Sequence, residues 1–107
     1  DETTAKIYAM VENIDQNVGQ LLAMLREQKL DEHTMVVFLT DNGPQQRRFN
    51  GELRALKGTV YEGGTRVPCF VRWPAAVQAG TKIDRVAAHI DWTPTILEAT
   101  GTRSTAA

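Results

Sequence analysis

The chain has 107 residues, of which 42% are hydrophobic, a formal net charge of −1 at pH 7 and a pI near 6.1. A nearly neutral chain has no general attraction to nucleic acid or to an anionic membrane surface, so neither is expected as a partner. No apolar run approaches the roughly 18 residues that a membrane-spanning helix needs, and the single cysteine, Cys69, excludes an internal disulfide.

Residues 4–29 are predicted to form one long amphipathic helix. Apolar residues recur at alternating steps of four and three and would line one face of it: Ile7, Val11, Ile14, Val18, Leu21 and Leu25. A coiled-coil seam is the alternative, but the stripe ends after about three heptads, which favours a helix packed on a sheet.

A strand is predicted over residues 34–40, directly after a short loop. Its apolar residues, Met35 to Leu39, follow one another without polar alternation. Such a run is typical of a strand buried on both faces of a parallel or mixed sheet, with neighbours on both sides. The predicted fold class is therefore α/β: a three-layer α/β/α segment with a central, mostly parallel or mixed sheet.

The polar residues that end this strand are a candidate metal site. Asp41 and Asn42 carry two side-chain oxygens on consecutive residues, and Gly43 lets the backbone turn sharply. In sheets of this kind, ligands bind beyond the carboxyl ends of the strands. A carboxylate beside a carboxamide oxygen suits a hard cation, calcium or less readily magnesium. Taken alone, these residues favour an ordinary turn, because Asp, Asn and Gly also dominate turns.

Residues 41–66 are predicted to form an irregular active-site loop. A long aperiodic stretch inside a compact domain tends to be functional. Its cationic residues are Arg47, Arg48, Arg54, Lys57 and Arg66. A cationic loop beside a metal-binding strand end suits an anionic substrate such as sulfate or phosphate. For Arg47 and Arg48, ordinary solvated surface charge is the favoured interpretation.

Two glycine-containing motifs in this loop are not nucleotide-binding motifs. Lys57-Gly58-Thr59 lacks the preceding glycine-rich run of a phosphate-binding P-loop. Gly63-Gly64 is predicted to permit either a positive φ or a close backbone approach around the lysine. Glu62 and Arg66, four residues apart, are predicted to pair or to brace the loop.

The rest of the chain is predicted to contain two strands and a helix, at residues 67–73, 85–90 and 93–100. Cys69 lies in an apolar run and is predicted to be a small buried hydrophobe. His89 has no His or Cys partner and is interpreted as a packed or surface histidine, and Asp91 as a helix cap.

Three ordered segments carry a family resemblance that covers nearly the whole chain. They are Thr40 to Gly43, Leu53 to Pro68, and His89 to Leu97. In this order they resemble the type I, arylsulfatase-like sulfatases of the alkaline phosphatase superfamily. The resemblance implies a sulfuric ester hydrolase with a calcium-centred site, where a cysteine matured to formylglycine in a Cys/Ser-x-Pro-x-Arg motif supplies the nucleophile.

The resemblance also assigns roles to three residues. Asp41 and Asn42 match two metal ligands of the family, and Lys57 matches the lysine that contacts the sulfate group, in binding and in catalysis. The implied substrate is a small sulfate ester or a sulfated glycan. The implied location is periplasmic, secreted or lysosomal.

The sequence departs from the family pattern in two respects. It has no Asp-Asp pair for the remaining calcium ligands, and Cys69 lacks the proline and the correctly spaced arginine of the nucleophile motif. Residues 1–107 are therefore expected to be a later part of a sulfatase catalytic domain, incomplete relative to the family domain and inactive alone.

Two other functions stay open on the sequence. A phosphodiesterase or phosphonate hydrolase of the same superfamily uses a similar metal edge, and a plain Thr or Ser nucleophile would favour it. The chain would otherwise be a non-catalytic folding or interaction fragment, whose exposed sheet edges promote self-association.

Overall fold

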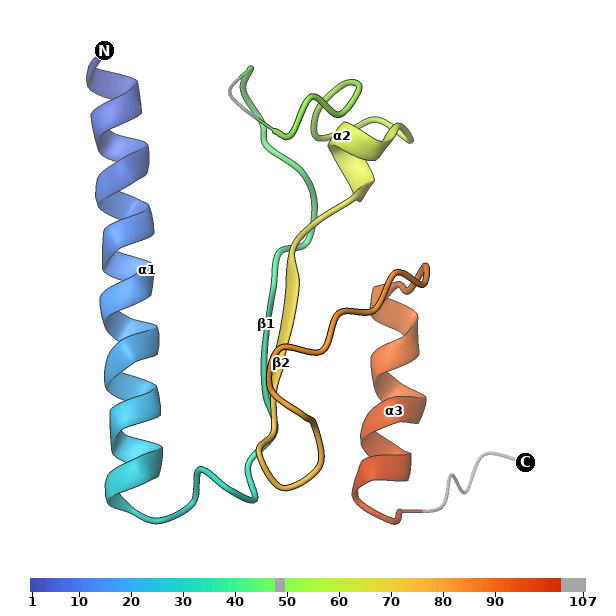
Figure 1. Ribbon diagram of the computed structural model, residues 1–107. Coiled ribbons are helices and arrows are strands. Elements are labelled where there is room, and N and C mark those ends of the chain that lie inside the picture. The colour runs from blue at the N-terminus through green and yellow to red at the C-terminus, as the bar shows by residue number, and fades with distance from the viewer. Residues whose placement is uncertain (48–49, 103–107) are drawn as a thin grey trace.

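The computed structural model describes residues 1–47 and 50–102. Arg48, one of the cationic residues of the predicted active-site loop, lies outside the described residues. The regular elements, labelled in Figure 1, are α1 (Glu2–Glu27), β1 (Val36–Leu39), α2 (Glu62–Thr65), β2 (Cys69–Arg72), the 3-10 helix η1 (His89–Asp91) and α3 (Trp92–Ala99).

Helix α1 corresponds to the predicted helix 4–29 and begins and ends two residues earlier. Asp1 is its N-cap, since the Asp1 carboxylate accepts a hydrogen bond of 2.7 Å from the Thr4 backbone N–H. At the other end Lys29 adopts a positive φ of 57°, and the Leu30 N–H donates to the Leu25 carbonyl at 2.8 Å. Local capping therefore sets both ends of this helix.

The apolar stripe of α1 is largely uncovered. Leu25 is the one buried hydrophobic residue of the described chain, whereas Val11 and Ile14 are 56% and 46% exposed. Neither β1 nor β2 approaches α1 within 8 Å between Cα atoms. The predicted packing of this helix on a sheet is therefore not seen in the described residues.

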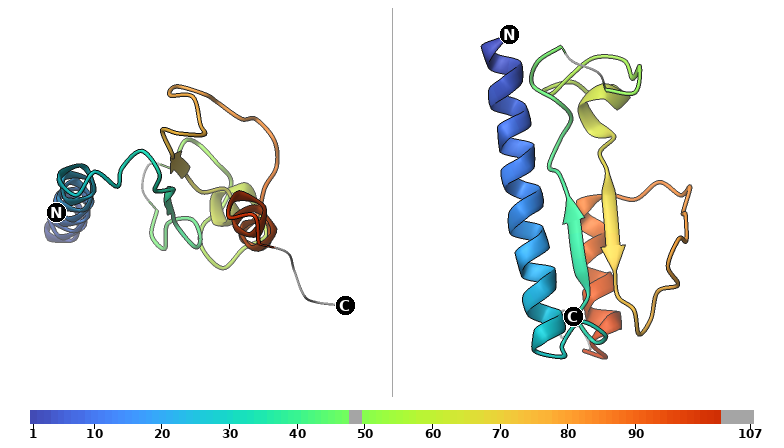
Figure 2. Two further views of the ribbon diagram at one scale, coloured as in Figure 1. Left: turned by 90° about the horizontal axis from the view of Figure 1, so that it is seen from below. Right: turned by 60° about the vertical axis from the view of Figure 1, so that its left-hand side comes forward.

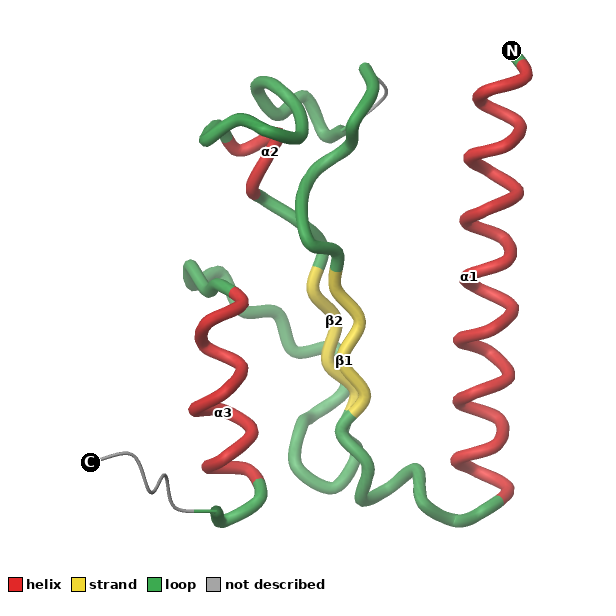
Figure 3. Tube along the Cα trace, turned by 180° about the vertical axis from the view of Figure 1, so that it is seen from behind, coloured by secondary structure: helices red, strands yellow, loops and turns green. Residues whose placement is uncertain are grey.

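Strands β1 and β2 form an antiparallel pair, and this corrects the expectation of a parallel or mixed sheet. Val36 pairs with Arg72 and Leu39 with Cys69, and the Phe38 and Phe70 rings stack across the strands with centroids 6.4 Å apart. An uninterrupted apolar run indicates burial but does not fix strand direction. Between β1 and β2 the described chain has irregular loop and the four-residue helix α2, which is too short for a parallel crossover, and Figure 3 traces the antiparallel return.

The described sheet has two strands, so β1 has a strand neighbour on one side only. Figures 1 and 2 show α1 and α3 on opposite sides of this pair. Neither helix has a Cα atom within 8 Å of a Cα atom of the strand pair. The described part is a mixed α and β segment, and the three-layer arrangement stays a prediction. No helix among the described residues combines the length and the apolar character needed to cross a membrane.

The predicted strand at residues 85–90 is wrong. Residues 86–88 have no regular structure and His89 begins η1, which continues into α3. The Asp91 carboxylate accepts a hydrogen bond of 2.7 Å from the Ala88 N–H, and its backbone carbonyl accepts one from the Thr95 hydroxyl. Such local side-chain bonds compete with strand pairing. Asp91 therefore acts as a capping residue, but from inside η1.

Candidate functional site

The polar end of β1 brings the first two predicted site residues together. The Asn42 side-chain amide donates a hydrogen bond to the Asp41 carboxylate, and the Thr40 hydroxyl donates to the Asn42 backbone carbonyl at 3.4 Å. Asp41 is exposed and Asn42 is half-buried. The two side chains thus form one polar pair at the carboxyl end of the strand.

This pair fits calcium in the chemistry of its donors but not in their number. A carboxylate and a carboxamide are oxygen donors, whereas calcium normally takes about six to eight oxygens. The described residues contain no group of three or more His, Cys, Asp or Glu side chains that could hold a metal ion. Asp41 and Asn42 therefore account for only part of a calcium coordination shell.

The backbone of Lys57 is hydrogen-bonded to the segment that follows this pair. The Lys57 N–H donates to the Pro44 carbonyl at 3.0 Å, two residues beyond Asn42. The side chain is exposed, and no ion pair within the described residues involves its ammonium group. The structure therefore brings the chain around Lys57 next to the candidate metal ligands.

Three glycines hold these segments together, and we call them the glycine contact: Gly43, Gly63 and Gly64. The Gly43 N–H donates to the Gly64 carbonyl at 2.9 Å, and a Cβ on Gly43 would overlap the Gly63 carbonyl oxygen. A Cβ on Gly64 would lie 2.5 Å from the Thr59 carbonyl oxygen and 2.6 Å from that of Leu56. Helix α2 thus contacts the strand end on one side and the loop that carries Lys57 (the lysine loop) on the other, backbone against backbone.

The glycine contact decides between the two roles that the sequence left open for Gly63-Gly64. Neither residue has a positive φ, and both are buried. Their function is close backbone approach, which only a residue without a Cβ permits.

Replacing Gly63 by alanine is expected to open the lysine loop. The added Cβ would meet the carbonyl oxygens of Arg54 and Ala55 at overlapping distance, and overpacking of this kind costs about 1–3 kcal/mol. Tryptic cleavage after Arg54 and Lys57, followed by mass spectrometry in a protein containing this segment, should then accelerate by about tenfold.

Gly19→Ala is the matched control for that substitution. Gly19 lies inside α1 with no heavy atom within 4 Å of an added Cβ, so the change should stabilise the helix slightly and leave loop cleavage unchanged. Equal cleavage of the Gly63→Ala and native loops would contradict the role assigned to the glycine contact.

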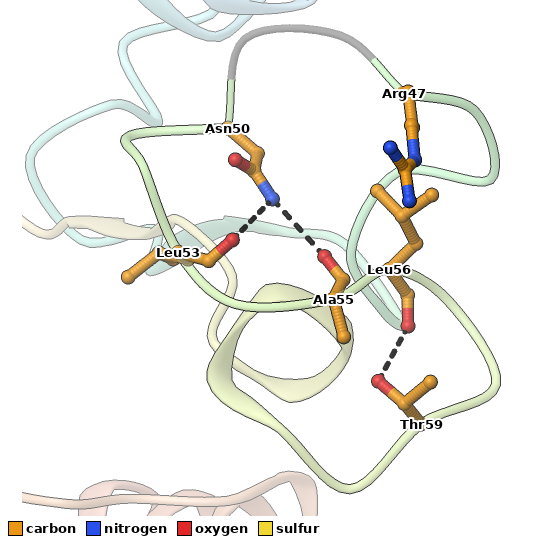
Figure 4. Close-up of a pocket in the computed structure, with 6 residues that line it drawn as sticks. All are labelled: Arg47, Asn50, Leu53, Ala55, Leu56 and Thr59. Atoms are coloured by element: carbon orange, nitrogen blue, oxygen red, sulfur yellow. Dashed lines mark hydrogen bonds between the residues drawn. The ribbon is translucent and has the colours of Figure 1, made fainter.

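Two pockets adjoin the site. One is lined at the strand end by Thr40, Asn42 and Gly43, and on its far side by Arg66, Val67 and Pro68. Figure 4 shows the other, which is lined by Arg47, Asn50, Leu53, Ala55, Leu56 and Thr59. Asn50 borders both pockets, and its side-chain amide donates to the carbonyls of Leu53 and Ala55 at 3.0 and 3.2 Å.

Arg66 lies beside the candidate site, which its four-residue spacing from Glu62 did not predict. The two residues do pair, at 3.5 Å and with both side chains mostly exposed, so the pair contributes little to stability. Arg66 also borders the pocket that contains Asn42. The signal in the sequence was its place in the cationic loop, which did not distinguish it from the other arginines.

Cys69 is exposed, which corrects the prediction of a buried cysteine. It lies opposite Leu39 in the strand pair, and no layer of the described residues covers that position. His89 is an exposed residue of η1.

Comparison with known proteins gives consistent matches along the chain. The family model described as Sulfatase matches residues 2–102. Human steryl-sulfatase is 36% identical over 101 residues, which cover 85% of this chain and 17% of that protein. A sulfatase of Formosa agariphila is 37% identical over 94% of this chain and 20% of its own length, and human arylsulfatase A is 37% identical over 82% and 18%. The chain thus spans no more than about a fifth of the length of these relatives.

Proposed function

The chain belongs to the sulfatase family, and we propose that it supplies part of the calcium and sulfate-ester site of a sulfuric ester hydrolase. One observation carries the proposal: backbone hydrogen bonds join the strand end that bears Asp41 and Asn42 to the loop that bears Lys57. A pair of candidate metal ligands and a cationic side chain on adjoining segments are two of the parts that metal-assisted hydrolysis of an anionic ester uses.

In this proposal Asp41 and Asn42 each donate one side-chain oxygen to the cation. Asp41 contributes the negative charge of the pair, and Asn42 orients that carboxylate through their mutual hydrogen bond. A bound calcium ion would polarise the sulfate oxygens and stabilise the charge that develops on them. Additional oxygen ligands would come from outside residues 1–107.

Lys57 acts on the substrate in this proposal. Its ammonium is a compact positive charge on a flexible stem, which suits contact with a sulfate oxygen. As the ester bond breaks, the same group can give a proton to the leaving oxygen. The nucleophile, formylglycine by family resemblance, would also lie outside this chain, because Cys69 lacks the required sequence context.

An activity comparison tests the proposal. The pure 107-residue chain should show no turnover of para-nitrophenyl sulfate, because removing a nucleophile alone costs several orders of magnitude in rate. A longer protein that contains this chain and a Cys-x-Pro-x-Arg motif should hydrolyse it, and should hydrolyse para-nitrophenyl phosphate more slowly.

The contrary results are equally specific. Turnover by the pure chain that disappears in Cys69→Ala would make Cys69 the nucleophile. A preference of the longer protein for the phosphate ester would replace the sulfatase assignment with a phosphohydrolase of the same superfamily.

A further inference from the structure

Two side chains close the base of the loop that carries Lys57. The Arg54 guanidinium lies over the Tyr61 ring, with its central carbon 3.8 Å from the ring centroid, and its Nη2 donates a hydrogen bond of 3.0 Å to the Tyr61 hydroxyl. Stacking and hydrogen bonding act together on the same pair, which fixes the guanidinium more firmly than either contact alone. We call Arg54 and Tyr61 the loop clamp.

The backbone of both clamp residues is held by α2. The Gly63 N–H donates to the Arg54 carbonyl and the Gly64 N–H to the Tyr61 carbonyl, each at 2.8 Å. The six residues between the clamp residues form a closed loop, and Lys57 lies within it. The hydrogen bond from the Lys57 N–H to Pro44 ties this loop to the strand end.

The loop is bent into a conformation that needs support. Ala55 has a φ of +66° and Gly58 one of +83°, so left-handed residues occur on both sides of Lys57. A non-glycine residue rarely adopts this conformation, because its Cβ crowds the following carbonyl. Strain of this kind persists only where surrounding contacts hold the chain. The Asn50 amide on the Ala55 carbonyl and the loop clamp are such contacts.

We propose that Arg54 and Tyr61 are positioning residues that fix the lysine loop, so that the Lys57 ammonium meets the sulfate group of the bound ester. The inference rests on the substrate role proposed for Lys57. No buried apolar side chain lies beneath this loop in the described residues, so its geometry depends on the clamp, on Asn50, on the hydrogen bond from Lys57 to Pro44 and on the glycine contact. Displacing a catalytic group by about 1 Å can cost up to about 100-fold in rate.

A double-mutant cycle in a longer protein that contains this chain tests the inference. Arg54→Met removes the charge and the hydrogen-bond donor but keeps a long side chain. With para-nitrophenyl sulfate as the probe, it should lower kcat by about 10- to 100-fold, with Tm and calcium affinity nearly unchanged. In the Lys57→Ala background, Arg54→Met should have little further effect on kcat, because the group that it positions is already gone.

Two further variants sharpen the cycle. Tyr61→Phe keeps the ring and loses only the hydroxyl acceptor, so it should lower kcat less than Arg54→Met does. If Arg54→Met fails to fold, Tyr61→Phe takes its place in the cycle. Arg85→Met is the matched control, since Arg85 is an exposed arginine remote in sequence from the loop, and its kcat should equal that of the native protein.

The outcomes separate the two proposals. If Lys57→Ala lowers kcat but the clamp substitutions leave kcat unchanged, or multiply fully with Lys57→Ala, the positioning role is overturned while the proposed function stands. If Lys57→Ala keeps full kcat, the substrate role of Lys57 fails and the positioning role fails with it.

Discussion

Asp41→Ala, made in a protein that contains the complete site, is expected to lower kcat/KM by about 100-fold or more and to weaken calcium binding. Asp41 supplies the carboxylate of the candidate metal pair, and its removal also leaves the Asn42 side-chain amide without the acceptor that it has in this structure. Asp41→Asn should be intermediate, because it keeps an oxygen donor and loses the negative charge.

Calorimetric titration with calcium and steady-state kinetics on para-nitrophenyl sulfate measure the two effects separately. Magnesium should bind more weakly than calcium, because it requires near-octahedral geometry and gives up its water reluctantly. Asp84→Ala, at an exposed aspartate in the loop that follows β2, is the matched control and should change neither quantity. Full calcium affinity and full activity in Asp41→Ala would show that this strand end is an ordinary turn.

Lys57→Ala is expected to lower kcat by about 100- to 1000-fold while calcium affinity stays nearly unchanged. The lysine charge would act on the sulfate group and the leaving oxygen rather than on the metal, so the two measurements should separate. Lys57→Arg should recover only part of the rate, because a planar guanidinium cannot replace a compact ammonium in proton transfer.

The control for the lysine is Lys82→Ala, which removes an equal charge from an exposed loop outside the site. Its kinetics should match those of the native protein. A loss of calcium affinity in Lys57→Ala as large as that in Asp41→Ala would mean that the lysine maintains the metal site itself, and would contradict its assignment to the substrate.

The sequence was most informative where a regular period or a local cap determines the structure. The four-three spacing from Ile7 to Leu25 located α1 to within two residues at each end. The apolar run that ends at Leu39 located β1, although the observed strand is shorter than predicted. These patterns report which face of an element is apolar. They do not show which element covers that face, so the exposure of the helix stripe could not be predicted. They also do not fix strand direction, so the antiparallel direction of β2 could not be predicted.

Elsewhere, local chemistry overrode the pattern. The strand expected at residues 85–90 is not formed, and the Asp91 carboxylate instead accepts a hydrogen bond from the Ala88 N–H and caps η1. In the candidate site, Asp41, Asn42 and Lys57 were named from the motifs and from the family resemblance, and their roles stay predictions. The loop clamp could not be named in this way, because Arg54 and Tyr61 meet through an irregular loop whose fold no periodicity describes.

The strand register described above has a consequence for how the site segment could be exchanged between proteins. Leu39 and Cys69 are paired neighbours, so the described residues between them leave and re-enter the sheet at the same end of the strand pair, as the upper part of Figure 1 shows. Its internal contacts in the described residues include backbone hydrogen bonds, glycine approaches and the loop clamp, all within the segment. Transfer of such a segment to another protein would therefore require, at the least, two antiparallel strand ends at ordinary spacing in the host. Changes in loop length inside the segment add closure entropy only slowly.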